Sequence, residues 1–216
     1  MIRISDSSFG GGDFVSEMMI YEQEQYDKGI TLLAGIDEVG RGPLAGPVVA
    51  CALILPRSSA IIGVNDSKKV SEKKREALYD LILAEAVSVG IGCITHDVID
   101  HINILRATHK AMAKALARLV PQPQHVLVDG YPAEGLHIPQ TAIVQGDSKS
   151  YLIAAASIVA KVTRDRIMRQ FHETYPEYDF ASNKGYGTKK HIAAIEKYGV
   201  LPIHRISFCK RFVSIE

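Results

Sequence analysis

The sequence predicts a mixed α/β fold in which one sheet of about five strands is flanked by helices. Three observations predict it: short apolar runs rich in β-forming residues, helical spacing of apolar residues between these runs, and a chain order that mixes the two patterns. With 216 residues, 47% of them hydrophobic, the chain is long enough for one full core but short for two independent domains. We therefore expect a loose N-terminal segment over residues 1–28, with one short surface helix, and one domain over residues 29–216.

Apolar, β-rich runs predict five strands, at residues 31–36, 48–55, 89–94, 125–128 and 141–144. Between the second and third strands, Ser71 is a candidate N-cap for a helix with four apolar residues at helical spacing: Leu78, Leu81, Ile82 and Val87. A single long helix is expected from about Asp97 to Leu119.

Two further helices follow the last strand. Residues 151–162 are apolar nearly all round, which predicts a helix buried against the sheet until residues 164–166 bring it to the surface. Thr188 is expected to cap a helix that ends at Gly199. The tail at 204–211 concentrates basic residues around Phe208, so we interpret it as an added basic arm or as a solvated edge of a C-terminal helical extension.

Composition restricts the partners and the compartment. The 25 basic and 24 acidic residues nearly cancel, so a nucleic-acid partner would need a local basic patch. The three cysteines, Cys51, Cys93 and Cys209, are far apart, which argues against a disulfide framework and against a zinc site. The sequence has no signal-peptide pattern and no apolar run of about 18 residues. We expect a soluble, cytoplasmic monomer with no membrane partner.

The most informative stretch is GIDEVGRGPLAGP at residues 35–47, which follows the first predicted strand. Its glycines do not match the spacing of a dinucleotide-binding loop or of a Walker loop, and Asp37 and Glu38 would repel a phosphate. Divalent cations between acid and phosphate remove that repulsion, and carboxylate oxygens suit Mg²⁺ or Mn²⁺. The alternative for an Asp-Glu pair alone is an exposed acidic turn.

Two more acids, Asp129 and Asp147, stand at the predicted ends of later strands. Adjacent strand ends can bring such side chains together with Asp37 and Glu38, and four converging carboxylates would imply two metal ions about 4 Å apart. From spacing alone, scattered surface acids are an equal alternative.

Several ordered motifs resemble bacterial ribonuclease HII. They are AGIDEVGRGPLAGPVV, NDSKKVSEKKRE, HVLVDG, QGDSKSYLIAAASIVAKVTRD and NKGYGTKKH, and the resemblance spans about residues 31–212. It implies a ribonuclease H-like fold in which residues 29–216 form the catalytic domain. It also implies an endonuclease that cuts the RNA strand of RNA–DNA hybrids and incises 5′ of single ribonucleotides in duplex DNA.

The resemblance also implies residue roles. The family's metal-binding and catalytic carboxylates match Asp37, Glu38, Asp129 and Asp147, with two Mg²⁺ or Mn²⁺ ions activating a water and stabilising the leaving oxygen, to give 3′-hydroxyl and 5′-phosphate ends. Its ribonucleotide-sensing loop matches Gly40, Arg41 and Gly42, and its sugar-packing tyrosine matches Tyr186. Without the resemblance, the glycines would be interpreted as shaping a turn and Tyr186 as packing a loop.

Weaker candidates surround this set. Ser67, Lys68 and Lys69 precede a helix and are candidates for phosphate contacts, although a solvated lysine pair is the usual interpretation. Lys161 and Arg164 are candidates for contacting phosphate or neutralising the acids, with structural pairing as the alternative. Two histidines, His109 and His191, are candidates for proton transfer, a role that most lone histidines do not have.

Three other functions compete with this interpretation. Ribonuclease HIII, a related hybrid nuclease, usually carries a longer N-terminal domain, whereas about 30 residues precede the first motif here. A non-catalytic nucleic-acid-binding protein would not need four acids and would bind without metal. A nucleotide-dependent oxidoreductase would need the glycine spacing that this sequence lacks.

Overall fold

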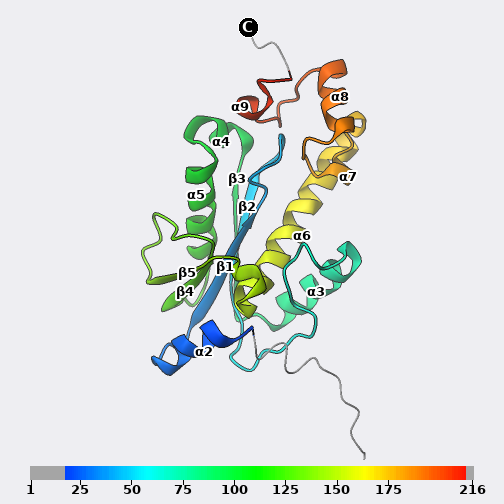
Figure 1. The fold of residues 1–216 in the computed structure, drawn as a ribbon. Helices are drawn as coiled ribbons and strands as arrows, with labels where there is room; N and C mark the ends of the chain where they lie inside the picture. The colour runs from blue at the N-terminus through cyan, green and yellow to red at the C-terminus, as the bar shows by residue number, and fades with distance from the viewer. Residues whose placement is uncertain (1–17, 213–216) are drawn as a thin grey trace, which may run out of the picture.

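The computed structural model describes residues 18–212, which form one mixed five-stranded sheet with helices on both faces (Figure 1). The strand order across the sheet is β3-β2-β1-β4-β5. The central strand β1 runs antiparallel to β2 and parallel to β4, while β2–β3 is antiparallel and β4–β5 is parallel. The predicted fold class is confirmed. The strands are β1 Leu33–Val39, β2 Val48–Ile54, β3 Ser88–Ile94, β4 His125–Asp129 and β5 Gln140–Ile143.

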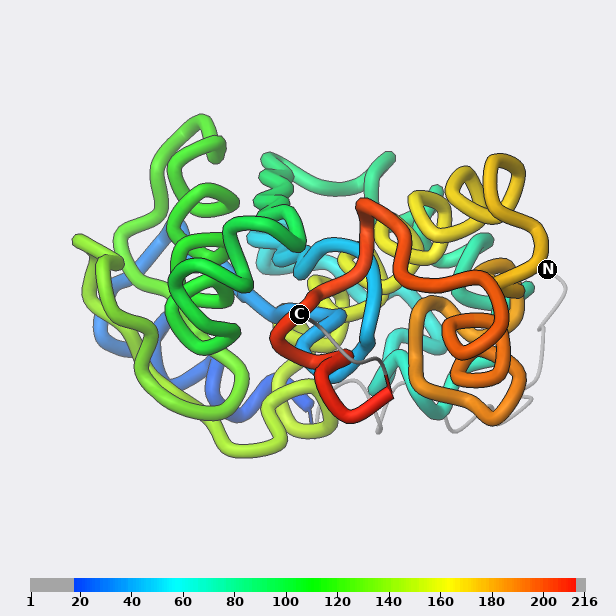
Figure 2. Tube along the Cα trace, turned by 90° about the horizontal axis from the view of Figure 1, so that it is seen from above, coloured from blue at the N-terminus to red at the C-terminus, as the bar shows by residue number. Residues whose placement is uncertain are grey.

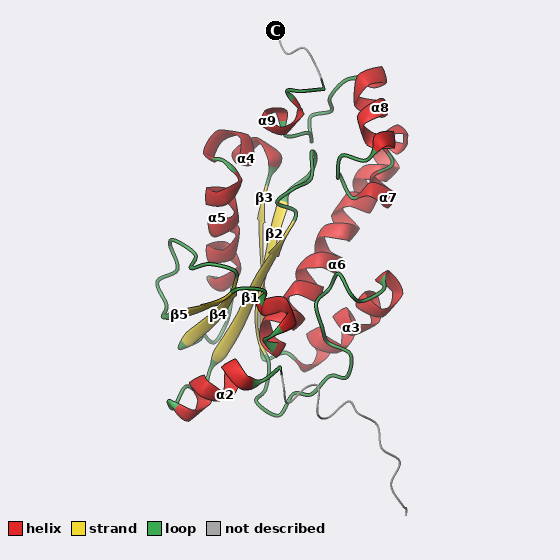
Figure 3. Cartoon of the chain, in the orientation of Figure 1, coloured by secondary structure: helices red, strands yellow, loops and turns green. Residues whose placement is uncertain are grey.

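Helices pack on both faces of the sheet (Figure 3), and each face buries its own apolar core. Helices α3 (Glu72–Glu85) and α6 (Tyr151–Thr174) cover one face, and α4 (His96–Ile102) and α5 (Ile104–Leu116) cover the other. Side chains alternate along a strand, so Leu33 packs under α6 while Ile36 packs under α5. Glycine permits the closest approach of helix to strand, because a Cβ on Gly35 would lie 2.3 Å from the Leu152 carbonyl carbon of α6.

The structure corrects three details of the predicted helices. The expected long helix is two helices, since Asn103 adopts φ 69° and its side chain accepts from the Arg106 N–H at the start of α5. Ser71 caps α3 as predicted, but Leu81 and Val87 are exposed rather than buried. Helix α6 continues past residues 164–166 to Thr174, and of these three residues only Arg166 is exposed, whereas Arg164 and Asp165 are buried.

A third apolar cluster joins the end of α6 to the C-terminal helices. These are α7 (Phe180–Asn183), α8 (Lys189–Tyr198), which Thr188 caps as predicted, and α9 (Ile206–Cys209). Figure 2 shows the C-terminal segment crossing the connection between β1 and β2, where Ala45 forms a β-bridge with His204. The tail is therefore packed into the domain, and the interpretation as a basic arm or solvated edge is wrong for the buried His204 and Arg205, whereas Lys210 and Arg211 are exposed.

The predicted N-terminal segment lies mostly outside the described residues. Within them, α2 (Ile20–Asp27) is the expected short helix, and its Glu22 is fully buried. The Glu22 carboxylate accepts hydrogen bonds from the Ser150 hydroxyl and from the Leu152 N–H, at the start of α6. No helix within residues 18–212 is long and apolar enough to cross a membrane.

Candidate active site

The paired acids Asp37 and Glu38 lie inside β1, not after it as the sequence suggested. Alternation along the strand turns Asp37 toward the face covered by α6 and Glu38 toward the face covered by α5. Asp37 is 6% exposed, whereas Glu38 borders a small cavity together with Thr108 and Met112 of α5. The two carboxylates therefore point to opposite faces of the sheet near the C-terminal end of the central strand β1.

The other two acids reach this edge from β4 and from the turn after β5. Ile36 pairs with Val128 in the parallel ladder, so Asp37 and Asp129 occupy the next equivalent positions. Asp129 ends β4 as predicted, whereas Asp147 lies beyond β5 in the 3₁₀ turn η1 (Gly146–Ser148). The Gly146 N–H donates to Asp129 Oδ1 over 2.6 Å, which ties the turn to the strand end.

The electrostatics of these acids show that they share one region. Burial raises the pKa of Asp37 well above its usual range, and the charges of the other three acids raise it further. Burial also raises the pKa values of Glu38 and Asp129, with an added contribution to Asp129 from Asp147. Carboxylates held this close destabilise one another when ionised, so the arrangement favours bound cations.

Each carboxylate has its own partner in this structure. The Glu38 N–H donates to Asp37 Oδ1 over 2.7 Å, Arg41 lies 3.3 Å from Glu38, and Lys68 lies 3.1 Å from Asp147. Across residues 18–212, no three acid, histidine or cysteine side chains are arranged closely enough to enclose one ion. The donor set nevertheless fits Mg²⁺ or Mn²⁺, because all its side-chain ligands are oxygens and the contacting Arg41 and Lys68 side chains are largely exposed.

The glycine-rich loop after β1 lies directly beside Tyr186. Arg41 and Gly42 are exposed, and a Cβ on Gly42 would lie 3.7 Å from the Tyr186 ring. Gly40 has φ 94°, and a Cβ there would lie 2.2 Å from Arg164 Nε, so only glycine fits. The Tyr186 ring is 43% exposed and available for stacking.

A second cavity, of about 190 Å³, is lined by two of the acids and by two of the predicted cationic residues. Its lining includes Asp37, Glu38, Ser67, Lys68, Lys161 and Tyr186. Hydrogen bonding to Asp147 raises the pKa of Lys68, despite the opposing effect of partial burial. Lys69 is exposed and does not line this cavity.

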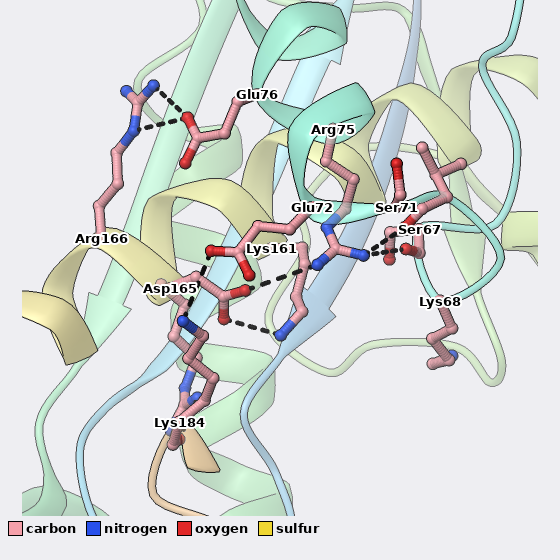
Figure 4. A network of polar contacts seen from close by, with 12 residues as sticks. Ser67, Lys68, Ser71, Glu72, Arg75, Glu76, Lys161, Asp165, Arg166 and Lys184 are labelled. Atoms are coloured by element: carbon pink, nitrogen blue, oxygen red, sulfur yellow. Dashed lines mark hydrogen bonds and ion pairs between the residues drawn. The ribbon is translucent and has the colours of Figure 1, made fainter. Parts of the chain in front are cut away.

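A buried polar network that the sequence analysis missed holds this cationic side (Figure 4). Asp165, 2% exposed, pairs with Lys161 over 2.7 Å and with Arg75 over 3.9 Å. Arg75 also donates to the carbonyl oxygens of Ser67 and Val70. One carboxylate on α6 thus positions both Lys161 and the loop that carries Ser67.

Two buried arginines hold the glycine-rich loop, and only one of them was a sequence candidate. Arg164, fully buried, donates to the carbonyl oxygens of Ala45, Pro47 and Lys184 over 2.8–3.1 Å. It therefore supports the loop and does not reach phosphate. Arg205, also fully buried, was assigned to the tail; charged residues are usually exposed, and no local pattern distinguishes this one from the other basic residues of the tail.

A histidine pair completes the support for Tyr186. His191 Nδ1 lies 2.9 Å from the Tyr186 carbonyl oxygen, and its Nε2 lies 3.0 Å from His204 Nε2. Both rings are buried, so His191 supports the backbone at Tyr186 from inside the domain and is not exposed for proton transfer. His109 borders the cavity beside Glu38, where its Nδ1 accepts from the Glu134 N–H.

Comparisons with known proteins show which family and which solved folds this chain is similar to. The family model for ribonuclease HII matches residues 34–211. A protein named ribonuclease HII from Acetivibrio thermocellus is 56% identical over 197 residues, which cover 91% of this chain and 77% of that protein. The solved structure of ribonuclease H2 from Pyrococcus horikoshii aligns with a TM-score of 0.71 at 27% identity, over 85% of this chain and 100% of that one. Bst-RNase HIII, solved in complex with Mn²⁺, shares the fold at 17% identity, with a TM-score of 0.59 over 78% of this chain and 63% of that one.

Proposed function

Because the chain belongs to the ribonuclease HII family of hydrolases that act on RNA, we propose that it cuts the RNA strand of RNA–DNA hybrids and incises duplex DNA 5′ of a single embedded ribonucleotide. The observation that carries the proposal is the mutual electrostatic repulsion of Asp37, Glu38 and Asp129 at the C-terminal ends of β1 and β4, beside the exposed loop at Arg41 and Gly42.

The acidic side of the site supports phosphodiester hydrolysis. Asp37, Glu38, Asp129 and Asp147 would hold two divalent cations, Mg²⁺ or Mn²⁺, which would supply an activated water and charge stabilisation for the leaving 3′ oxygen. The Mn²⁺ complex of Bst-RNase HIII, which has the same fold, favours such cations here. Cleavage by this route leaves 3′-hydroxyl and 5′-phosphate ends.

The other residues of the site support binding of a ribonucleotide within a duplex. Ser67, Lys68 and Lys161 line the cavity beside the acids and provide hydroxyl and ammonium donors for the phosphates on either side of the scissile bond. Tyr186 presents its ring edge next to Gly42, where it would pack on the neighbouring sugar. The backbone of Arg41 and Gly42 would read the 2′-hydroxyl that distinguishes RNA from DNA.

The experiment is cleavage of three labelled substrates with Mg²⁺ or Mn²⁺: a DNA duplex with one ribonucleotide, a long RNA–DNA hybrid, and an all-DNA duplex. We expect incision 5′ of the ribonucleotide and along the hybrid RNA, with 3′-hydroxyl ends and no cut in the all-DNA duplex. Asp129→Asn should lower the rate by about 100-fold or more, because it removes a charged cation ligand. Asp80→Asn, an exposed acid of α3, is the matched control and should cut normally.

Two results would contradict the proposal. Folded wild-type protein that binds these duplexes without metal and cuts none of them would be a binding protein. Equal cutting of the all-DNA duplex would show a nuclease without ribonucleotide recognition.

A further inference from the structure

One side chain of the C-terminal segment, Arg205, binds several carbonyl oxygens of the loop that links β1 to β2. Arg205 donates from Nη2 to the Gly40 carbonyl oxygen over 2.6 Å, from Nη1 to the Arg41 carbonyl oxygen over 2.9 Å, and from Nε to the Gly46 carbonyl oxygen over 3.0 Å. Because a guanidinium is planar and its donors are fixed in a fork, three carbonyls on one side chain fix the orientation of the loop.

These bonds determine where the loop's N–H groups point. In a planar trans peptide, the C=O and the following N–H point in opposite directions. The carbonyls of Gly40 and Arg41 face inward to the buried Arg205, so the N–H groups of Arg41 and Gly42 face outward. Neither N–H has a hydrogen-bond partner among the described residues, and both residues are exposed beside Tyr186.

Arg205 itself is fixed on several sides. Its backbone N–H donates to the Leu44 carbonyl oxygen over 2.8 Å, and its guanidinium lies over the Phe208 ring at 5.3 Å. Burial, and then the nearby charge of Arg164, lower the pKa of Arg205 to about 9, which leaves it charged at neutral pH. The side chain has no acidic hydrogen-bond partner within residues 18–212, so carbonyl binding is its role in the described structure.

We infer that Arg205 is a positioning residue for ribonucleotide specificity, which orients the peptide groups after Gly40 and Arg41 so that two N–H donors meet the 2′-hydroxyl oxygen. This inference rests on the proposed function. It assigns to the C-terminal segment a part in telling RNA from DNA, although that segment lies on the opposite side of the loop from the substrate.

The test separates specificity from stability. KM and kcat are measured for incision of a duplex with one ribonucleotide, and the all-deoxy version of the same duplex is used as a competitive inhibitor to obtain its Ki. In R205K, a single ammonium replaces the three-way fork, so KM should rise while Ki stays unchanged. We expect Ki/KM to fall by about tenfold, the effect of losing one or two net hydrogen bonds.

Arg118→Lys is the matched control. The Arg118 guanidinium also donates to a backbone carbonyl, that of Ile91 on β3, which lies outside the loop between β1 and β2. This variant should leave KM, Ki and their ratio at the wild-type values. An unchanged Ki/KM in a folded R205K protein would overturn the inference, whereas absence of incision by wild type would overturn the proposed function itself.

A measurement on the wild type covers the case in which R205K does not fold. Backbone amide chemical shifts are recorded by NMR with the ribonucleotide duplex and with the all-deoxy duplex, in metal-free buffer to prevent cleavage. The Arg41 and Gly42 amides should shift downfield only with the ribonucleotide duplex. Identical shifts with both duplexes would contradict the inference.

Discussion

Lowering the pH from 7 to 5 should destabilise the protein through its buried histidine pair. His191 Nδ1 donates to the Tyr186 carbonyl oxygen, which leaves its Nε2 as an acceptor for the Nε2–H of His204. His204 Nδ1 in turn accepts from the Leu201 N–H over 2.8 Å. Every ring nitrogen is satisfied only when both rings are neutral, because a further proton would place two donors face to face.

The magnitude follows from the pKa of His204. Burial, and then the neighbouring His191, lower this pKa from its ordinary 6.5 to about 4. The unfolded chain therefore takes up a proton below pH 6.5 that the folded protein refuses, so stability is fully present above that pH and is lost on acidification. Linkage gives a loss of about 2 kcal/mol between pH 7 and 5, and about 3 kcal/mol once the pH falls below 4.

The assay is urea unfolding of metal-free protein at a series of pH values. His204→Gln should begin less stable at pH 7 and should lose about 2 kcal/mol less than wild type by pH 5. The comparison between variants matters because burial raises the pKa values of Asp37, Glu38 and Asp129, which shifts stability in the opposite direction on acidification. His101→Gln, at an exposed histidine, should keep the wild-type slope. Parallel curves for wild type and His204→Gln would refute the reasoning.

Three more predictions concern the site. Gly40→Ala should lower the free energy of unfolding by about 1–3 kcal/mol, because Gly40 has a positive φ and an added Cβ would overlap Arg164. Gly42→Ala should instead melt like wild type but bind the ribonucleotide duplex more weakly. Thermal melts and duplex titrations of both variants check these outcomes. Asp165→Asn should lower the free energy of unfolding by about 3 kcal/mol, because it leaves the partners of a buried ion pair uncompensated. It should also raise the KM for the duplex more than it changes kcat, since it releases Lys161. An unchanged KM would argue against a positioning role for Asp165. Asp37→Asn should raise the stability of the metal-free protein, because it removes a buried charge that the neighbouring acids repel. Mn²⁺ at 100 times its Kd should stabilise the wild type by about 2.7 kcal/mol and this variant far less. Calorimetric melts with and without Mn²⁺ measure both effects.

Strand identities could be predicted from the sequence because each strand is a dense apolar run between polar turns. The C-terminal boundary of β1 could not be predicted from the sequence. Asp37 and Glu38 belong to the strand because they pair with β2, and a local hydrophobic pattern does not reveal that pairing. The break between α4 and α5 was also missed. It depends on Asn103 adopting a positive φ of 69°, while its side chain caps α5 by accepting from the Arg106 N–H.

The acids of the site were identified from their motifs, but their support was not. Arg205 and Asp165 act through carbonyl oxygens and ion pairs with segments far away in the chain, and charged residues are usually predicted to be exposed. A glycine-rich loop whose carbonyls have no strand or helix partner needs buried donors from elsewhere. That requirement is visible in the sequence, although the residue that meets it is not.

The most direct test of the account is a crystal structure of the protein soaked in Mn²⁺, with the ions located by anomalous scattering. We predict Mn²⁺ at the sheet edge, bound by Asp37 together with Glu38, Asp129 or Asp147, with Lys68 turned away from Asp147. Anomalous peaks elsewhere, with these carboxylates unoccupied in protein that still cleaves its substrate, would contradict the claim that they form the catalytic metal site.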